Sequence, residues 1–167
     1  MHKNIIAVYP GSFDPITNGH IDIVKRSLAI FGKLIVAVNA NTSKIPLFPV
    51  RERIHLVKTA LKEKNLHNRV IVEEFKGLAV DYLKTKKAKV IIRGLRFVSD
   101  FEYEFQMALM NRHLLESIET VFMMPDDKYV YLSSSIVKEI SRHGRPPKDF
   151  IPKCVEKAIM KKLEVRS

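Results

Sequence analysis

A doubly wound α/β fold, with helices on both faces of a five-stranded parallel sheet, is predicted for this 167-residue chain. One indication is that short apolar segments alternate with longer segments whose apolar residues recur every three or four positions. Another is that residues 34–38 are apolar throughout, as in a strand buried on both faces. Short connections between such segments require right-handed crossovers and parallel strands. A hydrophobic share of 46% at this length fits one domain spanning 1–167.

The order of the elements follows from these patterns. The first strand is expected at 5–8, and the 3, 4, 3 spacing of Ile21, Val24, Leu28 and Phe31 predicts the first helix after it. The other strands are expected at 34–38, 70–73, 90–92 and 120–124. The other helices are expected at about 51–64, around Val80 and Leu83, at about 100–115, from the serines at 133–135 to Gly144, and at about 152–163, packed on the domain. Ligands of such sheets bind beyond the carboxyl ends of the strands, so the five loops there are expected to form one site.

The segment 9–20, Tyr-Pro-Gly-Ser-Phe-Asp-Pro-Ile-Thr-Asn-Gly-His, joins the first strand to the first helix. Its Pro-Gly and Asn-Gly pairs are turn dipeptides that let the backbone approach a ligand. Ser12 and Thr17 supply hydroxyls, and His20 falls in the first turn of the helix. Free N–H groups and the helix dipole favour an anion there, so a phosphate beside His20 is expected. A histidine at this position can also be a cap or a surface residue.

Charge and cysteine content limit the classes of partner. The chain carries 29 Lys and Arg against 18 Asp and Glu, a formal charge of +11, which favours anionic partners. The cations are scattered, without an aromatic-interleaved stripe, so no nucleic-acid partner is expected. No apolar run approaches a membrane span, so no membrane contact is expected. The single Cys154 fits a reducing, cytoplasmic compartment and an inert role.

Five sequence segments carry a family resemblance. They are 9–22, Ile-Arg-Gly-Leu-Arg at 92–96, Asp-Phe-Glu-Tyr-Glu at 100–104, Met-Asn-Arg at 110–112 and Ser-Ser-Ser-Ile-Val-Lys at 133–138. With them, nearly the whole chain resembles the bacterial phosphopantetheine adenylyltransferases, in the nucleotidyltransferase superfamily with the T/H-x-G-H motif. The Thr-x-Gly-His element indicates only the superfamily, whereas Arg-Gly-Leu-Arg with Phe-Glu-Tyr-Glu selects the pantetheine branch.

The resemblance implies a Rossmann-like fold and transfer of the adenylyl group of ATP to 4'-phosphopantetheine. The products would be dephospho-CoA and pyrophosphate, in the penultimate step of coenzyme A biosynthesis. Attack would be direct and in line, without a covalent enzyme intermediate, with Mg²⁺ bound through the ATP phosphates and not by protein ligands. The family also implies a homohexamer built as a dimer of trimers, with possible feedback by coenzyme A.

The resemblance also implies the site residues. Catalytic roles would fall to His20, Lys44 and Arg93. The acceptor would be bound by Ser12, Lys44, Ala79 and Arg93. ATP would be bound by Ser12, Phe13, His20, Gly94, Leu95, Arg96, Glu104, Tyr129, Val130, Tyr131, Leu132, Ser133, Ser134 and Ser135.

Other interpretations of the same residues stay open. Lys44 could be an ordinary loop lysine, and Arg93 and Arg96 could be salt-bridge partners of Asp100 or Glu104. The serines could only cap a helix. The apolar residues of 100–115 could serve core packing or subunit contact. The rival functions are another nucleotidyltransferase, such as a nicotinate mononucleotide adenylyltransferase, and a non-catalytic basic RNA-binding protein.

Overall fold

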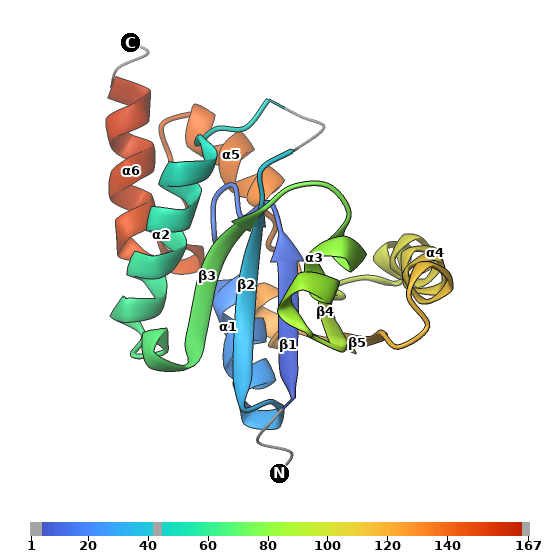
Figure 1. Cartoon of the computed structure of the whole chain (residues 1–167). Helices are drawn as coiled ribbons and strands as arrows, with labels where there is room; N and C mark the ends of the chain where they lie inside the picture. The colour runs from blue at the N-terminus through green and yellow to red at the C-terminus, as the bar shows by residue number, and fades with distance from the viewer. Residues whose placement is uncertain (1–4, 42–44, 165–167) are drawn as a thin grey trace.

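The computed structural model describes residues 5–41 and 45–164 and contains one parallel sheet in the order β3-β2-β1-β4-β5 (Figure 1). The strands are β1 Ile6–Gly11, β2 Lys33–Asn39, β3 Val70–Phe75, β4 Val90–Gly94 and β5 Glu119–Met123. The helices are α1 Asn18–Ile30, α2 Val50–Glu63, α3 Ala79–Lys86, α4 Val98–Leu114, α5 Ser134–Arg142 and α6 Lys153–Glu164. Short 3₁₀ turns lie at His67–Arg69, Asp127–Tyr129 and Lys148–Phe150. The predicted fold class is confirmed.

The largest difference from the expected boundaries is at the end of β1. The strand continues through the Pro10-Gly11 turn dipeptide, because Tyr9, Pro10 and Gly11 still pair with β2. The pairing with β2 continues to Gly11, so Ser12 is the first residue beyond the strand. Strand pairing therefore determines where the following loop begins.

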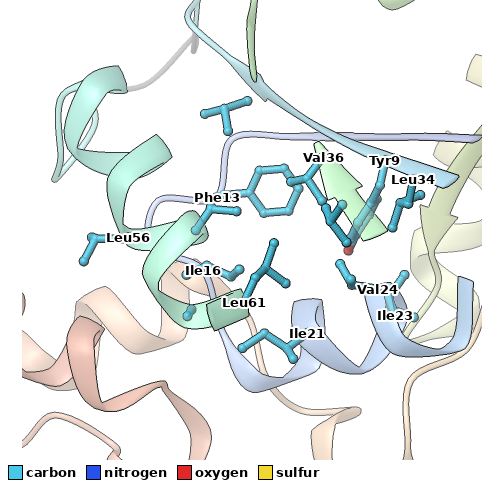
Figure 2. Close-up of a cluster of buried hydrophobic side chains, with 14 of the residues drawn as sticks. Tyr9, Phe13, Ile16, Ile21, Ile23, Val24, Leu34, Val36, Leu56 and Leu61 are labelled. Atoms are coloured by element: carbon cyan, nitrogen blue, oxygen red, sulfur yellow. The ribbon is translucent and has the colours of Figure 1, made fainter. Parts of the chain in front are cut away.

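The strands alternate their side chains between two apolar layers. In β1, Ala7 and Tyr9 join the larger core with α1, α2, α5 and α6, whereas Val8 joins a smaller core with α3. Figure 2 shows Tyr9 in the larger core with Val24 of α1 and Leu61 of α2. The period of two along a strand thus gives each face of the sheet its own helical cover.

The order of connection places a switch point beside β1. The chain passes from β1 to β2 and β3 on one side, then crosses to β4 and β5 on the other. Both β2 and β4 pair directly with β1. The loops after β1 and β4 therefore separate above the sheet, which is where ligands of doubly wound folds bind.

Helix α4 contributes little to either core. None of the α4 residues whose burial the structure describes is buried, and the exposed apolar side chains include Phe101, Phe105, Leu109 and Met110. In Figure 1 it stands to the side of the sheet, beyond α3. Core packing is therefore the wrong interpretation for most of this apolar surface.

The last described helix contributes to the larger core. Helix α6 lies along α2 (Figure 1), and its Val155 and Ile159 are buried in the larger core. Among the described helices, none combines the length and apolarity needed to cross a membrane.

Candidate active site

Two adjoining cavities open at the carboxyl ends of the strands. The first, of about 290 Å³, is lined by the loop after β1, the start of α1, the end of β4 and the start of α5. The second, of about 700 Å³, extends over β2, β3, α3 and α4. Both are lined by Pro10, Gly11, Ser12, Arg93, Glu104, Ser134 and Ser135. Loops following all five strands contribute, so the predicted convergence is confirmed for the described residues.

The start of α1 fixes the orientation of His20. Thr17 is the N-cap, and its Oγ1 accepts a hydrogen bond from the His20 backbone N–H at 3.3 Å. In return the Thr17 N–H donates to Nδ1 of His20 at 3.0 Å, and Thr17 Oγ1 lies 2.9 Å from the same nitrogen. Because Nδ1 accepts a backbone N–H, the neutral ring carries its proton on Nε2. The His20 ring is thus set as a donor through Nε2.

The surroundings of His20 favour its neutral form. The ring packs edge-on against Phe13, with centroids 5.2 Å apart, and 6.4 Å from the Tyr9 ring. Burial and then the positive charge of Arg96 lower the pKa of His20 to about 4. Burial also raises the pKa of Tyr9. At neutral pH the site therefore presents an uncharged imidazole N–H.

Arg93, at the end of β4, is held in place by Glu104 of α4. Its Nε and Nη2 donate to the two carboxylate oxygens at 2.6 and 2.5 Å, and Nη1 donates to the Pro10 carbonyl at 3.1 Å. Burial alone would lower the pKa of Arg93, but the Glu104 carboxylate raises it above its ordinary value. The salt-bridge interpretation of Arg93 is confirmed, and the bridge fixes a guanidinium on the wall shared by both cavities.

Arg96 and the start of α5 also line the first cavity. Arg96 donates to Asp100 at 3.2 Å and to the Leu132 carbonyl at 3.2 Å. The hydroxyl of Ser133 caps α5 by accepting from the Ile136 N–H at 3.1 Å, so the capping interpretation is also confirmed. Ser134 Oγ donates to the Pro15 carbonyl at 2.8 Å. The first-turn N–H groups of α5 are positioned to receive an anion.

Most of the predicted site residues lie on these walls. The first cavity is lined by Ser12, Phe13, His20, Arg93, Gly94, Arg96, Glu104, Tyr129, Leu132, Ser133, Ser134 and Ser135. Ala79, at the start of α3, lines the second cavity. Leu95, Val130 and Tyr131 are absent from the lining of both cavities, and 76% of Tyr131 is exposed. Lys44 lies outside the described residues, so its role stays a prediction.

The cavities offer few ligands for a metal ion. Among the described residues no group of three His, Cys, Asp or Glu side chains is placed to hold one. Glu104 lines both cavities, and both of its oxygens already accept from Arg93. The side chains present therefore suit a metal that arrives on phosphate oxygens more than one caged by protein. Cys154 lines neither cavity, and burial raises the pKa of its thiol to about 11.

Comparison with known proteins identifies the family. The phosphopantetheine adenylyltransferase of Geotalea daltonii is 56% identical over 154 residues, which cover 92% of this chain and 94% of the relative. That of Caldanaerobacter subterraneus is 54% identical over 159 residues, covering 95% of this chain and 98% of the relative. The chain belongs to the phosphopantetheine adenylyltransferase family. The predicted resemblance is confirmed.

Two further comparisons concern the wider family and the fold. Residues 8–140 match the Cytidylyltransferase-like family. This matched segment includes the strand-end loops that line both cavities. A putative nicotinate-nucleotide adenylyltransferase from Vibrio parahaemolyticus superposes with a TM-score of 0.71, over 93% of this chain and 97% of the other. At 16% identity that likeness shows the fold alone.

Several residues that line the second cavity were not predicted. Asn39 ends β2, Asn41 follows it, Asn111 lies on α4 and Lys138 on α5, all lining this cavity. Asn39 and Asn41 do follow an apolar strand, so the strand-end rule could have identified them. Asn111 and Lys138 lie within helices, where no local pattern separates a cavity residue from a surface residue.

Proposed function

We propose that this protein transfers the adenylyl group of ATP to 4'-phosphopantetheine, giving dephospho-CoA and pyrophosphate. The observation that carries the proposal is the wall common to the two cavities, on which Ser12, Arg93 and the start of α5 face both. A nucleotide in the first cavity and an acceptor in the second would meet at that wall. Family membership supplies the identity of the two substrates.

The residues present suit attack of one phosphate on another. Two anions must approach, and charge accumulates on the nonbridging oxygens of the α-phosphate. The neutral Nε2–H of His20 would donate to that phosphate as its charge grows. Arg93, oriented by Glu104, would offset the charge of the incoming acceptor phosphate beside Ser12. The acceptor is itself the nucleophile, so no covalent enzyme intermediate is required.

Other residues of the first cavity would hold the departing group and the adenosine. Arg96 and the serines at the start of α5 line this cavity, and the guanidinium and the helix-start N–H groups suit a pyrophosphate. Tyr129 and Leu132 add apolar surface beside Gly19 for a base. Mg²⁺, bound through ATP oxygens, would supply further charge neutralisation when present.

The larger cavity would take the pantetheine arm. It passes from Arg93 and Ser12 over Phe75, Leu78 and Ala79 toward Asn111. Its mixed apolar and amide lining suits an arm of methylene groups and amide bonds. Because coenzyme A contains the same arm, it would compete for this cavity, which supports the proposal of feedback by coenzyme A.

We further propose assembly into a homohexamer built as a dimer of trimers. Support comes from α4, several of whose apolar side chains stay about half exposed in the described part of the chain. Phe101, Phe105, Leu109 and Met110 are each more than 40% exposed. A contiguous apolar helix face of this kind is typical of an interface between subunits.

The test of the reaction is pyrophosphate release with ATP, Mg²⁺ and 4'-phosphopantetheine. Pantetheine without its phosphate is the matched control, because Arg93 would have no anion to bind. Nicotinate mononucleotide as acceptor tests the rival activity. Pyrophosphate release with 4'-phosphopantetheine as the acceptor, and not with the other two acceptors, supports the proposal. Pyrophosphate release only with nicotinate mononucleotide as the acceptor contradicts it.

A further inference from the structure

A buried arginine lies directly behind the site. Arg53, in the first turn of α2, is only 1% exposed, although it lies outside the lining of both cavities. Its Nη1 donates to the Ser12 carbonyl at 2.6 Å and to the Asn39 carbonyl at 2.8 Å. Its Nε donates to the Phe48 carbonyl at 3.1 Å. One side chain thus joins the loops that follow β1 and β2.

Burying the charged Arg53 side chain costs free energy, and a residue that served only to hold the fold together would not need that charge. Among the described residues Arg53 forms no ion pair, and its bonding partners are neutral carbonyls. Burial lowers the pKa of Arg53, an effect that the more distant Asp14 and Glu74 carboxylates oppose. An apolar side chain of similar size often stabilises a core at least as well as a buried charge. A requirement for its fixed set of donors would explain an arginine at this position.

Asp14 completes a reciprocal connection between the two loops. It is 3% exposed, and its Oδ1 accepts from the Phe48 N–H at 2.9 Å. Its Oδ2 accepts from the Leu47 N–H at 2.9 Å and from Lys138 Nζ at 3.0 Å. Phe48 is therefore held at its N–H by Asp14 and at its carbonyl by Arg53. The loop after β1 can shift only if this connection breaks.

The bond to Ser12 also sets the direction of the next N–H group. The Ser12–Phe13 peptide is trans, so its N–H points opposite to the carbonyl that Arg53 holds. Phe13 has a positive φ of 46°, a conformation that a non-glycine residue keeps only when its surroundings impose it. Its amide N–H has no acceptor among the described residues, and Ser12 and Phe13 both line the first cavity.

We propose that Arg53 is a positioning residue, which holds the Ser12–Phe13 peptide so that the Phe13 N–H donates to a nucleotide phosphate. This inference rests on the proposed adenylyl transfer. The guanidinium acts from behind the peptide and touches no substrate. Its loss would leave the two cavities open but would free the Ser12–Phe13 peptide to rotate away from the phosphate.

The experiment compares Arg53→Met and Arg53→Lys with Arg69→Met. Arg69 is a matched control, because its guanidinium also donates to backbone carbonyls, those of Leu28 and Phe31, at the far end of α1. For each purified protein we would measure the thermal midpoint, the Kd of ATP by calorimetry without acceptor, and kcat and KM for pyrophosphate release. The Kd of ATP separates a positioning role from a general loss of stability.

Arg53→Met is expected to weaken ATP binding about tenfold and lower kcat by about 10- to 100-fold. This is less than the roughly 100- to 1000-fold loss when an oriented donor is removed outright, because the Phe13 N–H is still present. Arg53→Lys is expected to fall in between, because an ammonium group reaches fewer of the three carbonyls. Arg69→Met is expected to change Kd and kcat by about twofold or less, even where its thermal midpoint falls.

Two results would overturn the proposal: wild-type Kd and kcat in the folded Arg53 variants, or equal losses in Arg69→Met. If Arg53→Met does not fold, the same measurements on Arg53→Lys decide. A wild-type protein that releases no pyrophosphate with 4'-phosphopantetheine contradicts the proposed function, while the Kd of ATP still tests Arg53.

Discussion

The folded protein should lose stability as the pH falls, because of His20, and replacing His20 with glutamine should remove this loss. The pKa of His20 falls from an ordinary value of 6.5 to about 4 in the folded protein, first because of burial and then because of Arg96. The unfolded chain therefore binds a proton between these two values that the folded protein does not. Stability should fall as the pH drops below about 6.5, with the full loss reached near pH 4.

The size of the effect follows from the same shift. Between pH 7 and pH 5 the linkage relation gives a loss of about 2 kcal/mol for His20 alone. Because the ring is only partly buried, solvent should reduce this to about 1–2 kcal/mol. His20→Gln keeps an N–H donor but has no proton to gain, so this part of the pH dependence should disappear.

The assay is urea unfolding of both proteins at pH 7, 6 and 5, at constant ionic strength. For each protein we would measure how much the unfolding free energy changes with pH, and then subtract the change in the variant from the change in the wild type. His113→Gln, on the exposed surface of α4, is the matched control and should leave more of the wild-type pH dependence than His20→Gln does. Equal losses between pH 7 and 5 in wild type and His20→Gln would refute the reasoning.

The same residue should control turnover. His20→Ala is expected to leave substrate binding within several-fold and to lower kcat by about 100-fold or more, because the donor acts on charge that develops only in the transition state. Steady-state pyrophosphate release and ATP calorimetry together measure both quantities. Loss of ATP affinity with an unchanged kcat would show that the donor serves binding and not the reaction.

Four further substitutions test the remaining contacts. Glu104→Ala should lower the unfolding free energy by about 1–3 kcal/mol, since it leaves the partly buried Arg93 unpaired, and should lower kcat/KM for the acceptor about tenfold. Glu119→Ala removes an exposed ion pair and should cost about 0.5 kcal/mol or less by the same denaturation assay; similar costs for the two variants would contradict the burial argument. Thr17→Val should cost about 1 kcal/mol through the lost cap of α1 and lower kcat several-fold, and an unchanged denaturation midpoint would count against that role. Phe105→Glu should shift the mass measured by light scattering toward smaller species if α4 is a subunit contact, and an unaltered mass would remove α4 from the interface.

Local signals in the sequence were enough for the strand and helix order. Apolar periodicity, the turn dipeptides before His20 and the polar starts of α1 and α5 all act within a few residues of one another. The strand-end rule then gathers Ser12, His20 and Arg93 into one region, since parallel strands end at the same edge. These features are determined by interactions between residues that are close in the sequence.

Arg53 shows what local patterns miss. Apolar spacing predicted Ile54, Val57 and Leu61 as the buried face of α2, but Arg53 lies one turn before Val57 and is more buried than Ile54. An arginine within an apolar stripe was the available signal, and a charged residue there is more often exposed. Its burial depends on carbonyls of Ser12 and Asn39, which come from other elements.

By itself, the sequence determined the succession of strands and helices, the loop in which a phosphate is expected, and the family. Only the tertiary structure decided the tautomer and low pKa of His20, the Arg93–Glu104 pair, the exposure of α4 and the burial of Arg53. The physical reason is range: periodicity and capping involve residues within one turn, whereas desolvation and charge pairing depend on segments that meet only after the sheet has formed.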